Sequence, residues 1–298
     1  MTKTSTISVW GLSASLTTLT EMHHDEAMEI FHRELNAMTC VASRFIPDSE
    51  LSTLNATTEP FRVSDRFSEL FAAALHAYAI TDGACDPTAL RALRAIGYDS
   101  DFAAIPVEAT MTSTQPLPGL AAVSFDPVRN IVQRPANVQF DFGATAKALT
   151  CDRVAALVGQ STGVCVEIGG DVAVGGPCPP EGWVIGIAES THITGREPKV
   201  AIRAGGIATS SQTERRWLTQ SGTRHHIIDP RTGDSSTSDI AAISVSAVDC
   251  VTANAFATAC IAWGEESVHA LTQAGWSARV RLTNGDTYVA GGWPEDHA

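Results

Sequence analysis

The segment that most constrains this chain is a strand-to-helix turn near its middle. A β-rich run, Val138–Phe142, ends in the small residues Gly143, Ala144 and Ala146, and Lys147 then opens a helical pattern. Small residues let a backbone approach a ligand closely. Lys147 falls in the first helical turn, where unpaired N–H groups and the helix dipole already favour an anion. The turn therefore predicts an anion-binding site, although an ordinary connection with a solvated lysine would have the same sequence.

Three further segments combine small residues with groups that can carry chemistry. One is an apolar strand, Cys165–Ile168, which is followed directly by Gly-Gly-Asp. The second, Gly206–Ser211, is a turn of small and hydroxyl-bearing residues. The third, His225–Gly233, is a short strand that closes on a Pro/Gly turn and brings His, Asp and Arg together. These segments favour a ligand site over an ordinary connection before Lys147.

In this order and at this spacing, the segments resemble those of the ApbE family of flavin transferases. That family carries Asp-Leu-Gly-Gly-Ile-Ala-Lys-Gly, Gly-Gly-Asp, Ala-Thr-Ser-Gly and His-Ile-(Ile/Leu)-Asp-Pro-Arg-Thr-Gly. Two N-terminal segments extend the resemblance. Arg44–Asn55 is similar to the family's aromatic-x-Pro-Asp-Ser-Glu-Leu-Ser-x-Leu-Asn, and Gly83–Thr88 is similar to Gly-Ala-Phe-Asp-Pro-Thr. Six motifs in one order, from about Val9 to Trp263, imply a single ApbE-like domain over residues 1–298.

The pattern of apolar residues predicts an α+β fold, and the resemblance implies an ApbE-like (T-fold-like) mixed-sheet core with packed helices. Helices are expected over residues 25–42, 65–79, 147–158, 251–263 and 265–273. Asp86 is expected to cap a helix that reaches Ile96, with Pro87 in its first turn. Short strands gather in the C-terminal half, hairpins are expected at 123–133 and 279–290, and residues 106–120 are expected to form a loop.

The net charge of the chain disfavours some classes of binding partner. The net charge is −13, from 20 basic and 33 acidic residues, and no basic stripe is present. This composition argues against binding to nucleic acid or adhesion to an anionic membrane. A dinucleotide ligand would then be held by local N–H groups, a metal ion or a few cations.

Cysteine usage and the N-terminus indicate the compartment. The seven cysteines include no Cys-x-x-Cys pair, so neither a disulfide scaffold nor a zinc site is expected. Residues 1–20 lack the apolar core of a signal peptide, and no apolar run is long enough to span a membrane. A cytoplasmic location is therefore expected, whereas many members of the family are exported lipoproteins.

Transfer of FMN from FAD to a protein hydroxyl is a phosphoryl transfer, and it needs positioning, charge neutralisation and a proton acceptor. The resemblance implies an FAD pocket at Phe45, Ala84, Cys85, Asp86, Asp141, Lys147 and Ile228. Asp141 could accept a hydrogen bond from a ring or ribose donor, or it could cap the end of the strand. Lys147 could neutralise a phosphate. Cys85 stands where the family usually has an aromatic residue or Met.

His226 is the expected general base, because imidazole titrates near neutrality. Strand alternation places His226 and His225 on opposite faces, so only one can point into the pocket. The resemblance selects His226, and His225 is expected to be exposed. Asp229 is the second expected catalytic residue, and Arg231 could hold either Asp229 or a phosphate. The transfer rate is expected to rise with pH through the ordinary histidine range.

The expected metal site departs from the family pattern. The family binds Mg²⁺ through a helical Asp, a Thr four residues later and a backbone carbonyl. The matching positions here are Asn254, Thr258 and the carbonyl of Ala144, with Ala257 where some members have a second Asp. Because Mg²⁺ prefers carboxylates, the amide of Asn254 predicts weak binding. Asp249 could compensate, but it is expected to cap the helix.

The resemblance implies a metal-dependent FAD:protein FMN transferase that joins FMN by a phosphodiester bond to a Thr or Ser of an acceptor flavoprotein. FAD is the expected substrate, Mg²⁺ the expected cofactor, and the acceptor flavoprotein the expected partner. Two alternatives remain open. An Mg²⁺-dependent FAD pyrophosphatase would let water attack instead, and a flavin-binding protein with a degenerate metal site would catalyse neither reaction.

Overall fold

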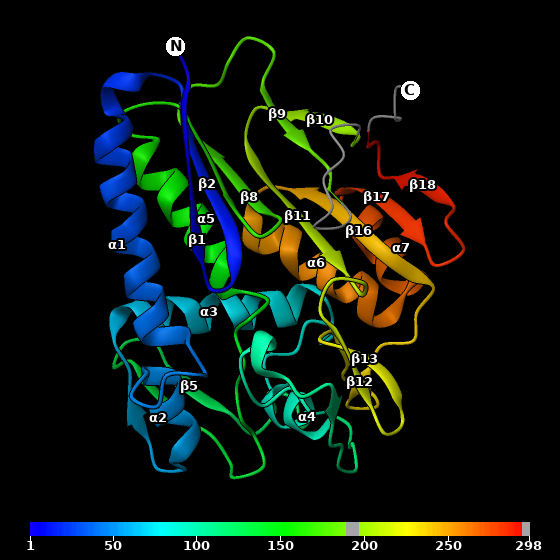
Figure 1. The fold of residues 1–298 in the computed structure, drawn as a ribbon. Helices are drawn as coiled ribbons and strands as arrows, with labels where there is room; N and C mark the ends of the chain where they lie inside the picture. Colours follow the sequence, from blue (N-terminus) through cyan, green and yellow to red (C-terminus); the bar gives the residue numbers. More distant parts are fainter. Residues whose placement is uncertain (189–196, 294–298) are drawn as a thin grey trace.

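An eight-stranded antiparallel sheet forms the centre of the protein (Figure 1). The computed structural model describes residues 1–188 and 197–293. The strand order is β1-β2-β7-β8-β11-β16-β17-β18, and each neighbouring pair is antiparallel. The strands are β1 (Lys3–Val9), β2 (Leu12–Thr18), β7 (Val164–Ile168), β8 (Asp171–Gly175), β11 (Gly205–Ser211), β16 (Ile240–Ala247), β17 (Ser277–Leu282) and β18 (Thr287–Ala290). The N-terminal hairpin therefore completes a sheet built mainly from the C-terminal half.

Helices cover one face of this sheet (Figure 1). They are α1 (His24–Ala42), α5 (Ala146–Val158), α6 (Cys250–Trp263) and α7 (Glu265–Gln273). α5 packs on β7 and β8, α6 packs on β11 and β16, and α5 also contacts α6. The two helices expected at 251–263 and 265–273 are confirmed, and Gly264, with a φ of 70°, separates them.

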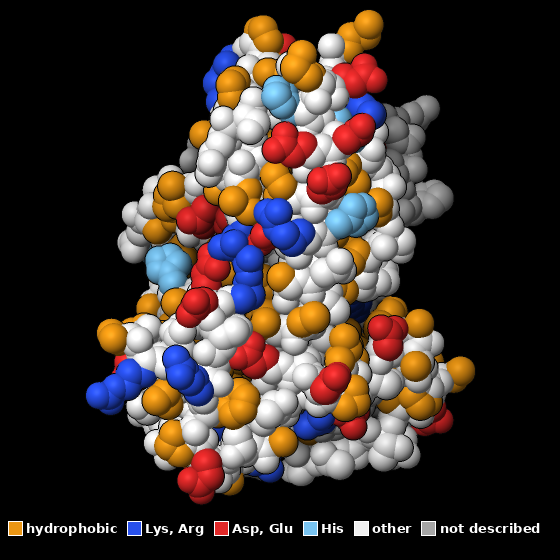
Figure 2. Space-filling model, turned by 90° about the vertical axis from the view of Figure 1, so that its left-hand side faces the viewer, with side chains coloured by type: hydrophobic (Ala, Val, Ile, Leu, Met, Phe, Trp, Pro, Cys, Tyr) orange, Lys and Arg blue, Asp and Glu red, His pale blue; other side chains and the backbone are white. Residues whose placement is uncertain are grey.

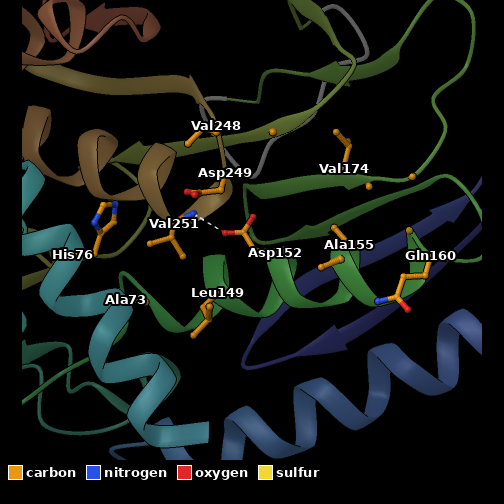
Figure 3. A pocket seen from close by; sticks show the side chains of 15 residues that line it. Ala73, His76, Leu149, Asp152, Ala155, Gln160, Val174, Val248, Asp249 and Val251 are labelled. Carbon is orange, nitrogen blue, oxygen red and sulfur yellow. Dashed lines mark hydrogen bonds between the residues drawn. The ribbon is translucent and has the colours of Figure 1, made fainter. Parts of the chain in front are cut away.

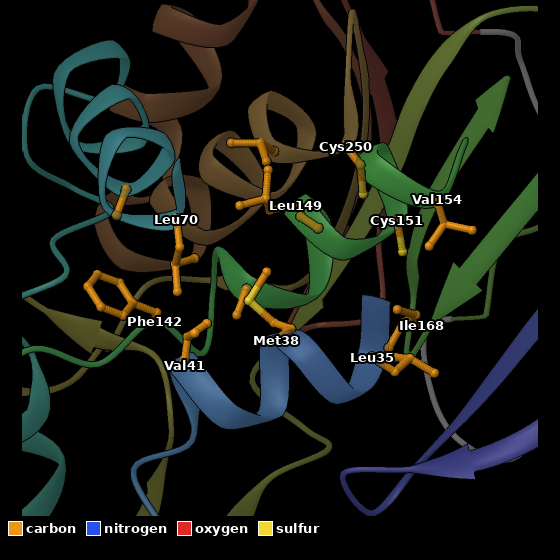
Figure 4. Packing of buried hydrophobic residues seen from close by; sticks show 14 of the residues in the cluster. Leu35, Met38, Val41, Leu70, Phe142, Leu149, Cys151, Val154, Ile168 and Cys250 are labelled. Atoms are coloured by element: carbon orange, nitrogen blue, oxygen red, sulfur yellow. The ribbon is translucent and has the colours of Figure 1, made fainter. Parts of the chain in front are cut away.

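The core between α1 and α5 follows from helical periodicity. Leu35 and Met38 lie on the buried stripe of α1 and pack into the cluster that contains Leu149 and Cys151 of α5 (Figure 4). Residues three and four positions apart share one helix face, so this stripe turns toward the sheet. The four side chains are almost inaccessible to solvent, and the packing fixes the start of α5 relative to the rest of the molecule.

The run Val138–Phe142 is buried but is not a strand, so that prediction was wrong. Asn55 takes the place of a neighbouring strand: its amide donates to the carbonyl of Phe140 at 2.9 Å and accepts from the same residue's N–H at 2.8 Å. The backbone N–H of Asp141 bonds to the carbonyl of Pro87 at 2.9 Å. A side chain and a loop thus provide the hydrogen-bond partners of this extended backbone, and no neighbouring strand is needed.

The helix expected to begin at Asp86 begins later, at Leu90, so that prediction was also wrong. Asp86 instead accepts hydrogen bonds from the N–H (2.8 Å) and hydroxyl (2.7 Å) of Thr88. These bonds form a local turn, which delays α4 (Leu90–Ala95). Both α4 and α2 (Glu50–Ala56) lie at the bottom of the view in Figure 1, beneath α3 (Asp65–Ile80).

Smaller elements complete the chain. The expected hairpin at 123–133 is present, and β3 (Phe61–Arg62) extends it to three strands. Within residues 106–120, β4 (Glu108–Ala109) pairs with β12 (Arg216–Thr219), so this segment is not wholly loop. The remaining elements are β3 (Phe61–Arg62), β4 (Glu108–Ala109), β5 (Ser124–Asp126), β6 (Ile131–Gln133), β9 (Trp183–Gly186), β10 (Lys199–Ile202), β12 (Arg216–Thr219), β13 (Gly222–His225), β14 (Ile228–Asp229), β15 (Asp234–Ser235), η1 (Glu21–His23) and η2 (Phe102–Ala104). Helices on a mixed set of sheets confirm the α+β class.

The surface agrees with the acidic composition. On the face that carries α1, basic and acidic side chains are interleaved rather than gathered into a basic stripe (Figure 2). Glu34 of α1 pairs with Arg66 of α3 and Arg153 of α5, each at 2.8 Å.

The cysteines form no disulfide. All seven, each within the described ranges, are free. Within residues 1–188 and 197–293, no helix has both the length and the apolar character needed to cross a membrane.

Candidate functional site

The turn before α5 holds its two charged residues in separate ion pairs. Asp141 accepts from the N–H of Gly143 at 2.8 Å and from Nε of Arg44 at 3.0 Å. Lys147 lies in the first turn of α5, and its Nζ donates to Oδ2 of Asp171. Lys147 is therefore not the solvated lysine of an ordinary connection. Where α5 begins, the backbone N–H groups of Thr145 and Ala146 both donate to the carbonyl of Phe142, at 3.0 and 2.8 Å.

Asp171 is the centre of this site, and sequence reasoning gave it no role. Its side chain is fully buried. One oxygen pairs with Lys147, and the other accepts from Nδ2 of Asn254 at 2.8 Å. Asp171 thereby joins α5 to α6. The signal for it was the Gly-Gly-Asp motif, because a carboxylate at a strand start after two glycines is seldom buried without a partner.

Two of the three residues predicted for the metal lie next to each other, and the third contacts the same helix. Asn254 and Thr258 share one face of α6, and Oγ1 of Thr258 is 3.5 Å from Oδ1 of Asn254. Ala144 packs in a small apolar cluster that includes Ala255 of the same helix. Asp249 caps α6 by accepting from the N–H of Thr252 at 2.7 Å, as predicted. In the part of the chain that the structure describes, no three His, Cys, Asp or Glu side chains are arranged to hold a metal ion.

Arg44 is a second residue that sequence reasoning missed. Its guanidinium lies over the ring of Phe45 at 4.4 Å and over the ring of Tyr98 at 4.3 Å, while Nε pairs with Asp141. The Arg44 side chain is only 6% exposed. The sequence feature that could have identified Arg44 is its position as the first residue of the motif that contains Phe45. Arg44 therefore connects the predicted flavin contact Phe45 to the predicted flavin contact Asp141.

The other residues predicted for the FAD pocket differ in accessibility. Phe45 is 43% exposed, whereas Ala84, Cys85 and Ile228 are buried. Burial raises the pKa of the Cys85 thiol to about 12, so Cys85 is a neutral packing residue. Burial also raises the pKa of Asp86, although the hydrogen bonds from its turn act in the opposite direction. Of this group, Phe45 presents the most surface to a ligand.

The two neighbouring histidines have different surroundings. His225 is buried, and its Nε2 lies 2.9 Å from the carbonyl of Ser236, so the expectation that it is exposed was wrong. His226 is half-buried, and its Nδ1 is inaccessible and has no partner among the described residues. Burial, followed by the positive charges of Arg215 and other neighbours, lowers the pKa of His226 to about 3. His226 is therefore neutral near pH 7 and can accept a proton.

Asp229 is held firmly by its neighbours. Arg231 donates to both carboxylate oxygens, with Nε 3.0 Å from Oδ1 and Nη2 2.9 Å from Oδ2. The indole N–H of Trp263 donates to Oδ1 at 3.2 Å. Burial alone would raise the pKa of Asp229, but the hydrogen bonds and charge of Arg231 outweigh it and lower the pKa. Of the two roles that the sequence left open for Arg231, the structure shows the pairing with Asp229.

A cavity of about 640 Å³ lies between α3, α5 and the start of α6 (Figure 3). It is lined by His76, Asp152 and Asp249, among others, and by none of the residues predicted for FAD or metal. Asp152 accepts from the N–H groups of Cys250 (2.8 Å) and Val251 (3.0 Å). Burial raises the pKa of Asp152 to about 7. The cavity is thus separate from the site, and its two carboxylates hold the first turn of α6.

Known proteins resemble this chain in sequence. A family model described as "ApbE family" matches residues 1–280. The FAD:protein FMN transferase of Treponema pallidum is 30% identical over 267 residues, which cover 82% of this chain and 73% of that protein. The enzyme of the same name from Vibrio cholerae is 29% identical over 243 residues, which cover 78% and 72%.

Solved structures are similar over nearly the whole chain. The ApbE protein from Thermotoga maritima has a TM-score of 0.83 at 23% identity, with 97% of each chain covered. The flavin transferase ApbE from Vibrio cholerae has a TM-score of 0.76 at 21% identity, again with 97% of each chain covered. At these identities the structural likeness establishes the fold.

Proposed function

Because the chain belongs to the ApbE family, we propose that it is an FAD:protein FMN transferase that attaches FMN to a hydroxyl group of an acceptor flavoprotein. Two relatives named FAD:protein FMN transferase carry the proposal, and the neutral imidazole of His226, near the charges of Arg215 and Lys147, supplies a proton acceptor. A proton acceptor next to cations meets the two main needs of phosphoryl transfer. The acceptor hydroxyl is proposed to belong to Thr or Ser.

The proposed reaction balances with groups that the chain supplies. The hydroxyl oxygen of the acceptor forms a bond to the flavin-side phosphorus of FAD. The bridging P–O bond breaks, and AMP leaves with the electron pair. The hydroxyl proton passes to His226, whose imidazole is neutral at pH 7 and becomes more basic when the negative phosphates of FAD bind next to it. Cationic side chains stabilise the charge on the phosphoryl oxygens, since preorganised charge counts for more inside a protein than in water.

The flavin pocket is proposed to lie along Phe45, Asp141 and Lys147. Arg44 fixes the direction of Asp141 and backs the ring of Phe45, so both are held in place before a ligand arrives. Phe45 is exposed enough to stack on a ring. Ala84, Cys85, Asp86 and Ile228 would form the wall behind these contacts. Asp229, immobilised by Arg231, is proposed to position the segment that carries His226.

The candidate oxygen ligands are placed where they could hold a magnesium ion, but they lack the negative charge that the ion prefers. The oxygens of Asn254 and Thr258 face each other, and Ala144 adjoins the same helix. These atoms, with the carbonyl of Ala144, would hold the ion. None carries a charge, and the neighbouring Asp171 is already paired with Lys147, so affinity should depend on phosphate oxygens of the substrate. When bound, the ion would neutralise negative charge on those phosphates.

The uncharged Asn254 also favours a second candidate, a flavin-binding protein whose metal site no longer supports catalysis. Three outcomes separate the possibilities. A transferase increases the mass of the acceptor by one FMN phosphodiester, a pyrophosphatase releases AMP without acceptor, and a binding protein retains FAD and does neither.

The deciding experiment incubates the purified protein with FAD, Mg²⁺ and a candidate acceptor, and then weighs the acceptor by mass spectrometry. An acceptor in which the target Thr is replaced by Val is the matched control. His226→Asn should reduce transfer while FAD binding persists. If AMP appears at the same rate with and without acceptor, the protein is a pyrophosphatase and the transferase proposal fails.

A further inference from the structure

Arg215 is a half-buried cation that no carboxylate neutralises in the part of the chain that the structure describes. It lies directly before β12. Its Nη1 is 3.3 Å from the phenol oxygen of Tyr98, which is uncharged. Among residues 1–188 and 197–293, no Asp or Glu oxygen lies within ion-pair distance of the Arg215 guanidinium. A cation taken partly out of water costs free energy unless an anion compensates it.

Unlike Arg215, the other two cations of the site each pair with a carboxylate. Lys147 pairs with Asp171, and Arg44 pairs with Asp141 at 3.0 Å. In a protein with a net charge of −13, carboxylates are abundant. A half-buried arginine without a carboxylate among the described residues is a candidate to bind an anion from outside the chain.

The position of Arg215 identifies where that anion would bind. Arg216 pairs with His225 between β12 and β13. Arg215 and His226, the next residues on the two segments, are therefore neighbours. After burial, the charge of Arg215 is the largest influence on the pKa of His226, ahead of His225 and Lys147. An anion bound by Arg215 would lie beside the group that accepts the proton of the attacking hydroxyl.

Tyr98 makes this placement rigid. It is buried, its ring centroid is 5.3 Å from that of Trp217, and the guanidinium of Arg44 covers its face. The phenol can therefore hold Nη1 of Arg215 in one direction without neutralising it. A planar guanidinium fixed in this way can present its remaining N–H groups to two phosphate oxygens at once.

We propose that Arg215 binds the pyrophosphate of FAD and stabilises the negative charge on the transferred phosphoryl group. This assignment rests on the proposed transferase function. In the step it assists, the acceptor oxygen bonds to the flavin-side phosphorus, the bond to the AMP phosphate breaks, and the proton passes to His226. Arg215 remains protonated throughout and exchanges no proton.

The test compares FAD with riboflavin, which has the ring but no phosphate. Dissociation constants are measured by flavin fluorescence for the wild type, Arg215→Met, Arg215→Lys and Tyr98→Phe. Arg216→Met is the matched control, because Arg216 is the exposed neighbour. Arg215→Met should weaken FAD binding on the order of 10- to 100-fold, as expected for loss of charge-assisted hydrogen bonds. Riboflavin binding should not change.

Further readouts separate recognition of phosphate from a structural role. Arg215→Lys keeps the charge, so its affinity for FAD should fall less than that of Arg215→Met. Tyr98→Phe should show a smaller fall in FAD affinity than Arg215→Lys. The salt dependence of FAD binding should decrease in Arg215→Met, because one screened attraction is gone. Single-turnover FMN transfer at saturating FAD should also slow in this variant.

Two results would overturn the assignment. One is FAD affinity in Arg215→Met equal to that of the wild type. The other is an equal loss of FAD and riboflavin binding in Arg215→Met and Arg215→Lys, which would indicate damage to the fold or to the ring site. If the wild type binds FAD but flavinylates no acceptor, the transferase proposal fails, and the FAD-riboflavin comparison still tests Arg215 as a phosphate ligand.

Discussion

Lowering the pH from 7 to 5 should leave kcat/KM for FMN transfer almost unchanged, because the pKa of His226 is about 3. A base with the ordinary pKa of 6.5 is about 76% neutral at pH 7 and about 3% neutral at pH 5, so its rate would fall about 25-fold. With a pKa of about 3, the neutral fraction at pH 5 is still about 99%. The rise in rate that the sequence suggested for the ordinary histidine range should therefore occur at much lower pH.

The physical cause of this shift can be tested separately. Burial disfavours the charged imidazolium, and the charges of Arg215, His225 and Lys147 act in the same direction, while the hydrogen bond to the main chain of Arg215 opposes them. Bound phosphates would add negative charge near the ring. The quantity to measure is therefore kcat/KM, which reports groups of the free enzyme, whereas kcat reports the complex.

The assay follows flavinylation of an acceptor by mass spectrometry between pH 5 and pH 8, with circular dichroism confirming the fold at each pH. This control is needed because burial also lowers the pKa values of His24 and His225. The unfolded chain then binds more protons than the folded chain below about pH 6.5, so stability falls as the pH falls. His226→Asn should cut the rate by about 10²- to 10⁴-fold. A fall of about 25-fold between pH 7 and pH 5 in folded wild-type protein would refute the reasoning.

Three further outcomes follow from the same contacts. Lys147→Met leaves the fully buried Asp171 without its cation and should lower the free energy of unfolding by about 3–5 kcal/mol, with partial recovery in the double variant Lys147→Met/Asp171→Asn, measured by urea denaturation. Asn254→Asp adds a carboxylate beside Thr258 and should raise Mg²⁺ affinity in calorimetric titration; unchanged affinity and turnover would show that these oxygens are not ligands. Asp249→Ala removes the cap of α6 and should cost about 1 kcal/mol of stability in thermal unfolding while FAD affinity persists.

Local features of the fold could be predicted from the sequence because they depend on neighbours in the chain. The apolar spacing of α3 and α6 predicted both helices, and Asp249 was correctly identified as a cap because a carboxylate three residues before a free N–H has few other geometries. The motifs around Asp141, Asn254 and His226 predicted the family, and a family model matches the chain over residues 1–280.

Two local predictions were wrong because other hydrogen-bond partners, one distant in sequence and one in a local turn, replaced the expected ones. Val138–Phe142 has the composition of a strand, but the side chain of Asn55 satisfies its backbone, so no ladder forms. Asp86 has the composition of a helix cap, but Thr88 supplies both an N–H and a hydroxyl to it, and the chain turns before the helix starts. Composition indicates what a segment can do, and the available partners determine which option it adopts.

The sequence by itself determined the types of group in the site and their order along the chain. The tertiary structure decided their charge states and partners. Asp171 meets Asn254 although they are 83 positions apart, and Lys147 meets Asp171 at a separation of 24. The imidazole of His226 is neutral because it is half-buried and cations from other segments lie near it. Pairing and desolvation depend on distances through space, which the order of residues does not specify until the core has packed.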